Sequence, residues 1–143
     1  MDVRIKRIDP TLPLPRYATA GAVAFDLCAR TTVTIGPRQT ARVPCNVVIE
    51  VPPGYALIVA SRSSTPSRKG LLKANGVGII DQDYCGDTDE IQALFHNVTN
   101  SAVTVERGER IAQALLIPAP RVTWDEVAHF GSDDRGGFGS TGV

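Results

Sequence analysis

The residues best suited to chemistry in this sequence are two aspartates that follow a short apolar run. Asp81 and Asp83 come directly after the run 77–80 and precede Gly86. In an extended strand the two carboxylates would share one face, where they could bind Mg²⁺ or accept a proton as a general base. A carboxylate that emerges from apolar surroundings can also be tuned as a base. Taken alone, the same pattern is more typical of turn residues that close a hairpin.

A second group of polar residues could bind an anionic ligand. Arg62, Ser63 and Ser64 end an apolar run, and their side-chain and backbone donors could form an anion cradle, although a solvated loop would look much the same. Gln113 lies within another apolar run, where its amide must find a hydrogen-bond partner or lower the stability. The position of Gln113 is therefore a mild indication of function.

The chain ends in RGGFGSTGV, a segment with four glycines. Its Phe138 could stack on a base, while Arg135, Ser140 and Thr141 could hydrogen-bond to phosphate oxygens. Glycine is costly to order, so the segment is either an unused end or one that orders when a ligand binds. Three of the glycines match the spacing of the dinucleotide fingerprint, but that match is spurious because no helix can follow it.

Composition indicates one ordinary globular domain of 143 residues, with 43% hydrophobic and 21% charged residues. No apolar run is long enough to span a bilayer, and the charged N-terminus is unlike a signal peptide, so we expect a cytoplasmic protein without a membrane partner. Three cysteines without C-x-x-C spacing and two isolated histidines argue against a disulfide scaffold or a zinc site. Equal numbers of basic and acidic residues, 15 each, argue against nucleic-acid binding.

Short strands punctuated by proline and glycine are the elements that must position these residues. The alternating and β-branched patterns predict strands at 3–8, 32–35, 46–51, 55–60, 77–81, 91–97, 102–106 and 110–117. Such a series predicts an all-β, antiparallel barrel or jelly roll, with one weak helical pattern at 64–70. A small barrel encloses few cavities, so loops and neighbouring subunits should build any site. Trp124, the only tryptophan, is predicted to anchor the core or a subunit interface.

Five stretches of the chain occur in the order of the five motifs of the homotrimeric dUTPases. They are AGAVAFDLCA (20–29), SRSS (61–64), NGVGIIDQDYCG (75–86), GERIAQ (108–113) and RGGFGSTG (135–142). The sequence resembles that family over nearly its whole length. The resemblance implies a jelly-roll-like β-barrel over 1–130 and a flexible glycine-rich C-terminal lid over 131–143. It also implies hydrolysis of dUTP to dUMP and pyrophosphate with Mg²⁺, in a homotrimer whose active sites lie between subunits.

The resemblance further implies roles for residues of the third motif. Asp81 matches the aspartate that activates the attacking water. Tyr84 matches the aromatic residue that packs on deoxyribose and leaves no room for a 2′-hydroxyl. The positions that read the uracil edge match Asn75, Gly78, Ile79 and Ile80.

Other motifs match the phosphate and metal surroundings. The phosphate-binding positions correspond to Arg62, Ser63, Ser64 and Gln113. Asp26 matches the aspartate that organises the metal site, while Mg²⁺ itself is held by substrate phosphates and waters, with no direct protein ligand implied. Phe138 matches the tail aromatic residue that covers the base. The remaining substrate-contacting positions of the tail are Arg135, Gly139, Ser140 and Thr141.

Three features depart from the family pattern. Ala24 stands where the first motif usually has glycine, and DTDE (87–90) is an insertion that could alter substrate contacts or the trimer surface. Arg135 directly precedes GGFG, so Arg110 or Arg121 could replace it at the phosphates.

Two other functions stay open at this point. A dCTP deaminase shares the barrel but would need a glutamate at the position of Asp81. A dUTP-sensing regulator that contacts a protein partner is a further possibility, for which the acidic insertion is the one hint, and a solvated loop explains that insertion equally well.

Overall fold

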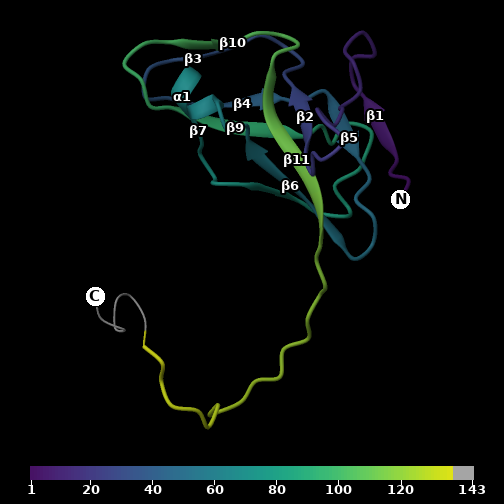
Figure 1. Cartoon of the computed structure of the whole chain (residues 1–143), viewed down its shortest axis with the longest axis vertical. Coiled ribbons are helices and arrows are strands. Elements are labelled where there is room, and N and C mark those ends of the chain that lie inside the picture. The colour runs from purple at the N-terminus through teal and green to yellow at the C-terminus, as the bar shows by residue number, and fades with distance from the viewer. Residues whose placement is uncertain (137–143) are drawn as a thin grey trace.

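The computed structural model describes residues 1–136 and is built almost entirely of short strands (Figure 1). The strands are β1 (Ile5–Arg7), β2 (Phe25–Cys28), β3 (Val33–Ile35), β4 (Thr40–Pro44), β5 (Val47–Ile49), β6 (Tyr55–Ser61), β7 (Leu71–Lys73), β8 (Gly78–Ile80), β9 (Gln92–Asn97), β10 (Val103–Val105) and β11 (Arg110–Pro118). A short helix, α1 (Thr65–Lys69), follows β6 and ends at Gly70, whose left-handed conformation suits glycine. No helix within residues 1–136 is long and apolar enough to cross a membrane.

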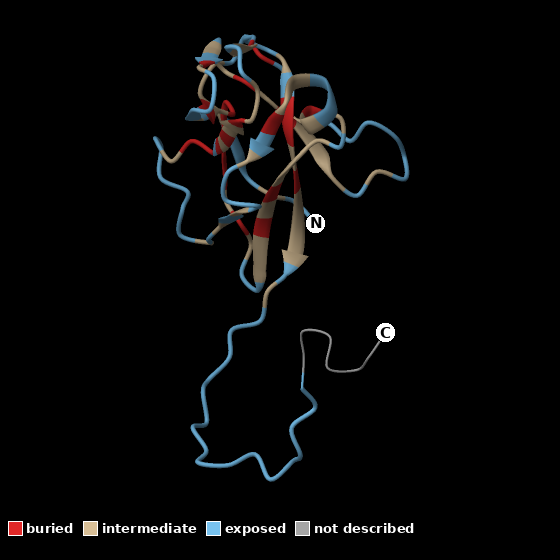
Figure 2. Ribbon diagram, turned by 90° about the vertical axis from the view of Figure 1, so that its left-hand side faces the viewer, coloured by how far each residue is buried: buried red, intermediate tan, exposed pale blue. Residues whose placement is uncertain are grey.

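All strand pairs are antiparallel and form small sheets that wrap around one core. The largest sheet has the order β2-β11-β6-β8, and a three-stranded sheet has the order β4-β9-β7. The pairs β1-β5 and β10-β3 complete the barrel. Buried side chains from these sheets and strand pairs meet in the interior. Figure 2 colours the ribbon of the buried residues red. The largest fully buried ones include Leu27, Ile35, Leu57, Leu71, Phe95 and Ile111. This arrangement confirms the all-β, jelly-roll-like fold expected from the sequence.

Every strand predicted from the sequence is present, as is the short helix, with ends that differ by at most two residues. Three strands were not predicted. Strand β2 carries Asp26 within an otherwise apolar stretch, and β4 is mixed in polarity and ends at Pro44. Strand β7 has only three residues. In each case pairing with a neighbouring strand, rather than local periodicity, fixes the backbone.

After β11 the chain continues as an extended segment that leaves the barrel (Figures 1 and 2). Residues 121–136 are all exposed. The prediction that Trp124 anchors the core is wrong for this chain, because its side chain lies in that segment and is 89% exposed. The alternative prediction, an anchor at a subunit interface, fits this exposure.

Candidate active site

The hairpin expected to receive the base has a free backbone edge, which can hydrogen-bond to a flat polar ring. Its two strands belong to different sheets: β7 pairs with β9, and β8 pairs with β6. Both are edge strands among the described residues. The turn between them is closed by Gly76, whose φ of +68° requires glycine-like freedom and whose N–H donates to the Lys73 carbonyl. The free edge of β8 therefore offers backbone N–H and C=O groups that have no strand partner.

Asp81 is the first residue after β8 and begins a turn. The Tyr84 N–H donates to the Asp81 carbonyl at 3.3 Å, so the interpretation of 81–84 as a strand with two carboxylates on one face is wrong, and the turn interpretation is confirmed. The turn is tied to the barrel by Gln82, whose Nε2 donates to the Tyr55 carbonyl at 3.1 Å. The Asp81 side chain is exposed, and no hydrogen bond or ion pair joins its carboxylate to another side chain of residues 1–136.

Asp81 lines a pocket of about 630 Å³ at the outer end of β8. Arg121, one of the two arginines considered as a replacement for Arg135, lines the same pocket, as do Tyr55 and Ile79. The apolar surroundings suggested by the sequence are only partly formed, since Ile79 is 64% exposed in the single chain.

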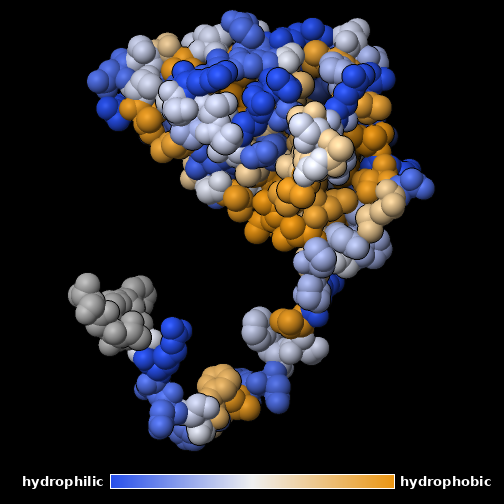
Figure 3. All heavy atoms as spheres, viewed as in Figure 1, coloured by the Kyte–Doolittle hydropathy of each residue, from blue (hydrophilic) through white to orange (hydrophobic). Residues whose placement is uncertain are grey.

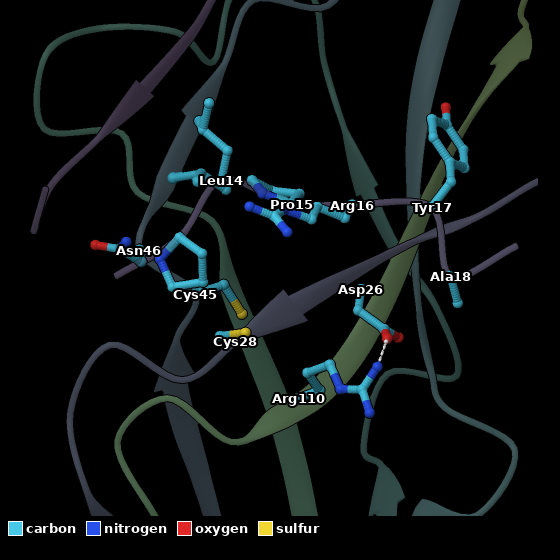
Figure 4. Close-up of a pocket in the computed structure, with 12 residues that line it drawn as sticks. Leu14, Pro15, Arg16, Tyr17, Ala18, Asp26, Cys28, Cys45, Asn46 and Arg110 are labelled. Carbon is cyan, nitrogen blue, oxygen red and sulfur yellow. Dashed lines mark hydrogen bonds and ion pairs between the residues drawn. The ribbon is translucent and has the colours of Figure 1, made fainter. Parts of the chain in front are cut away.

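Asp26 has a contrasting environment. Its Oδ1 accepts a hydrogen bond from Arg62 Nε at 2.8 Å, and its Oδ2 accepts one from Arg110 Nη1 at 3.0 Å. The second of these contacts is drawn in Figure 4, where Asp26 projects from β2 toward β11. The carboxyl side chain is only 14% exposed. Both oxygens of Asp26 are therefore engaged, and Arg110 is committed to Asp26.

The remaining predicted phosphate residues gather around the end of β6. Gln113 lies opposite Asp26 in the β2–β11 pair, and its Nε2 donates to the Ser61 carbonyl at 3.0 Å. The Gln113 amide therefore has the hydrogen-bond partner that its position in an apolar run requires. This bond also fixes the start of the turn that carries Ser63 and Ser64.

A pocket of about 250 Å³ adjoins this turn and is strongly basic. Its charged and polar lining residues are Arg62, Ser64, Thr65, Arg68, Lys69, Glu109 and Arg110. Sequence reasoning did not select Arg68 and Lys69, although the basic run in TPSRKG could have indicated them. Lys69 pairs with Glu109 at 3.0 Å, and Arg68 is exposed in the last turn of α1.

These residues form two groups that lie at opposite ends of β6. Ile80 pairs with Leu57, so Asp81 is level with Ala56, whereas Arg62 follows the other end of the strand. At about 3.3 Å per residue, the two groups are about 20 Å apart along β6. One chain therefore presents the predicted base-binding hairpin with Asp81 and the predicted phosphate cradle with Asp26 as two separate groups, and does not bring them together.

Two further residues at the hairpin were missed by sequence reasoning. The Lys73 Nζ is buried without a hydrogen-bond partner among the described residues, 5.6 Å from the centre of the Phe95 ring and beside Gly78. Burial lowers the pKa of Lys73. Glu90, the last residue of the acidic insertion, is buried, and its carbonyl accepts a hydrogen bond from the Tyr84 hydroxyl at 3.2 Å. Glu90 is therefore part of the barrel wall, while Asp87 and Thr88 of the insertion are exposed.

Of the tail residues predicted to contact the substrate, only Arg135 lies in the described part of the chain. Arg135 is exposed on the segment after β11 and makes no ion pair within residues 1–136. The predicted contacts of Phe138, Gly139, Ser140 and Thr141 lie outside the described residues.

Comparison with known proteins gives matches in one family. The family model for dUTPase matches residues 11–142. The deoxyuridine 5′-triphosphate nucleotidohydrolase of Hydrogenobaculum sp. (strain Y04AAS1) is 37% identical over 146 residues, which cover 100% of this chain and 99% of the relative.

Two solved structures have the same fold. The dUTPase from Streptococcus mutans superposes with a TM-score of 0.77 at 31% identity, over 84% of this chain and 98% of the other. The dUTPase of Staphylococcus bacteriophage 80alpha with dUPNHPP has a TM-score of 0.88 at 23% identity, and the match covers 99% of both chains.

Proposed function

Because this chain belongs to the dUTPase family and is a dUTP diphosphatase, we propose that Asp81 is the general base of dUTP hydrolysis. The observation that carries the proposal is the free carboxylate of Asp81, exposed at the end of the open hairpin and paired with no described side chain. A carboxylate with free lone pairs can accept the proton of the attacking water, whose oxygen bonds to the α-phosphorus. The bond from the α-phosphorus to the bridging oxygen then breaks, and pyrophosphate leaves.

The open edge of β8 is proposed to select uracil. Backbone groups at Gly78, Ile79 and Ile80, together with Asn75 in the turn, would pair with the polar edge of the ring. Cytosine presents a donor where uracil presents an acceptor, so a backbone group would be left unpaired by the wrong base. Tyr84 is proposed to pack on the deoxyribose and to exclude a 2′-hydroxyl.

The basic pocket at the end of β6 is proposed to hold the triphosphate. Arg62, Ser63, Ser64 and Gln113 supply donors to its oxygens, and Asp26 fixes Arg62 and Arg110 in place. Mg²⁺ fits this arrangement, because it needs mainly phosphate oxygens and waters, and Asp26 would organise the surroundings of the metal by holding Arg62 and Arg110. When bound, the metal ion would neutralise charge on the polyphosphate.

A homotrimer with sites between subunits is proposed from the separation of the two groups. A general base must lie within hydrogen-bond reach of the water that it activates, and about 20 Å along β6 is too far. Asp81 of one copy must then meet the phosphate cradle of another. The apolar side chains that gather where the C-terminal segment leaves the barrel (Figure 3) offer a surface for such assembly.

The C-terminal residues 131–143 are proposed to close over the bound nucleotide as a lid. Phe138 would cover the base, and Arg135, Gly139, Ser140 and Thr141 would contact the phosphates, with Arg121 as a further cation near Asp81. The three cysteines are free thiols, which supports the cytoplasmic location that we propose.

The proposed reaction is tested by incubating the pure full-length protein with dUTP or dCTP in the presence and absence of Mg²⁺. We expect pyrophosphate and dUMP from dUTP, with turnover that depends on Mg²⁺, and no ammonia from dCTP. Release of ammonia from dCTP would identify a deaminase instead and would contradict the proposal.

A further inference from the structure

We propose that Glu90 is a positioning residue for sugar selection: it holds Tyr84 in the position that excludes a 2′-hydroxyl. This inference rests on the role proposed above for Tyr84. It gives a function to the acidic insertion 87–90, which the sequence left open between a solvated loop and a functional element.

The Glu90 carboxylate is the most extensively bonded acid near the hairpin. Arg30 donates to it through two parallel hydrogen bonds, from Nε to Oε1 at 2.9 Å and from Nη2 to Oε2 at 2.8 Å. The Asn46 N–H donates to Oε1 at 2.7 Å. The Glu90 side chain is only 7% exposed. Paired, charge-assisted hydrogen bonds of this kind are strong and fix direction, so they hold the end of the insertion against the barrel.

The partners of Glu90 are themselves fixed. Asn46 has a φ of +68°, and its side chain accepts from the Asp9 N–H at 2.7 Å and donates to the Asp9 carbonyl at 3.1 Å. The neighbouring Ile91 N–H donates to the Val47 carbonyl, and its own carbonyl accepts from the Cys45 N–H, both at 2.9 Å. Backbone and side chain therefore both anchor Glu90 to the barrel wall.

Tyr84 is consequently held at both ends. The turn that starts at Asp81 fixes its backbone, and its hydroxyl donates to the Glu90 carbonyl at 3.2 Å. Two further contacts restrain the loop between Tyr84 and Glu90. Asp89 Oδ2 accepts a hydrogen bond from the Gly86 N–H at 2.7 Å, and Lys6 forms an ion pair with Asp87 at 2.7 Å. An aromatic ring that cannot swing aside is a better steric barrier to a ribose hydroxyl than a ring fixed only at its backbone.

The experiment compares kcat/KM for dUTP with kcat/KM for UTP in the wild-type chain, Tyr84→Phe, Glu90→Gln and the double variant. Loss of one such contact should lower the dUTP-to-UTP ratio about three- to tenfold in each single variant. Because both changes release the same ring, the double variant should lose no more selectivity than the more affected single variant. Glu50→Gln is the matched control, since it removes an exposed ion pair with Arg4 at 3.1 Å and should keep the wild-type ratio.

A wild-type ratio in both single variants, or losses that multiply in the double variant, would overturn the inference. If Glu90→Gln fails to fold, Tyr84→Phe decides alone, because it keeps the ring and removes only the hydroxyl. Failure of the proposed function would be seen in the wild-type chain and not only in the variants. If the wild-type chain hydrolysed UTP as readily as dUTP, the role proposed for Tyr84 would be contradicted, and this inference with it.

Discussion

Asp26 and Asp81, the two carboxylates of the proposed site, have opposite environments in this chain. Asp26 lies on β2, mostly buried, with Arg62 and Arg110 on its two oxygens. Asp81 follows β8 in an exposed turn, with no partner for its side chain among residues 1–136. The contrast indicates different roles: Asp26 is suited to position other groups, and Asp81 is suited to transfer a proton. A carboxylate that already neutralises two guanidinium groups is suited to hold them in place, whereas one with free lone pairs is available to water and substrate.

The largest effect should come from Asp81→Asn, which removes the free carboxylate and keeps its shape. Turnover of dUTP should fall about 10²- to 10⁴-fold, the contribution typical of a general base, while binding of a non-hydrolysable dUTP analogue is retained. Pyrophosphate release and calorimetric binding measure the two quantities. Asp83→Asn, a second carboxylate of the same turn, is the matched control and should keep most of the activity. Near-normal pyrophosphate release from Asp81→Asn would contradict the assignment.

Deletion of residues 131–143 should have the next largest effect. The barrel core and both carboxylates lie outside this segment, so the melting temperature should change little. Turnover should fall by about a hundredfold, because a nucleotide without its lid is less well positioned. Thermal melting and pyrophosphate release on the same sample check this. A truncated protein with full activity would show that the segment has no catalytic function.

Asp26→Asn should affect stability as well as turnover. Two hydrogen bonds from charged groups are weakened, so the free energy of unfolding should fall by about 1.5–3 kcal/mol, as measured by urea unfolding. Turnover should fall less than in Asp81→Asn, since Arg62 and Arg110 lose their orientation but keep their charge. If the two variants lost turnover equally and Asp26→Asn kept the wild-type stability, the assignment of different roles to the two carboxylates would be contradicted.

The smallest expected effect concerns a buried cation, Lys73, which can be compared with the paired cation Arg62. Lys73 Nζ is buried without a hydrogen-bond partner in the described part of the chain, unlike Arg62, so Lys73→Met should raise the free energy of unfolding by about 1–2 kcal/mol at neutral pH. The folded-state pKa of Lys73 is lowered by burial. The unfolded chain therefore binds more protons between that lowered value and the ordinary one, and the Lys73 contribution to stability rises with pH in this window. Urea unfolding at neutral and alkaline pH should show the rise in the wild-type chain and a smaller one in Lys73→Met.

The sequence predicted the barrel, and its motifs proposed the residues of both groups, but it did not predict the contacts that distinguish the two groups. Alternation located β1 and β3, β-branched and aromatic content located β5 and β6, and the motifs located Asp26, Arg62 and Asp81. The pairing of Arg62 with Asp26 joins residues far apart in the chain, and no local pattern encodes it.

The same holds for the residues around the hairpin. In the sequence nothing distinguishes Glu90 from the other two acidic residues of DTDE. The fold alone brings its side chain to Arg30 and Asn46. The distance between Asp81 and the phosphate cradle also depends on the register of β8 on β6, which follows from sheet formation and not from spacing along the chain.

The most direct test of the account is a crystal structure of the full chain with Mg²⁺ and a non-hydrolysable dUTP analogue. We expect the Asp81 carboxylate of one copy to lie about 2.6–3.2 Å from a water aligned with the α-phosphorus, with the triphosphate in the Arg62 cradle of another copy. An Asp81 side chain remote from that phosphorus, with no ordered water between them, would contradict the account.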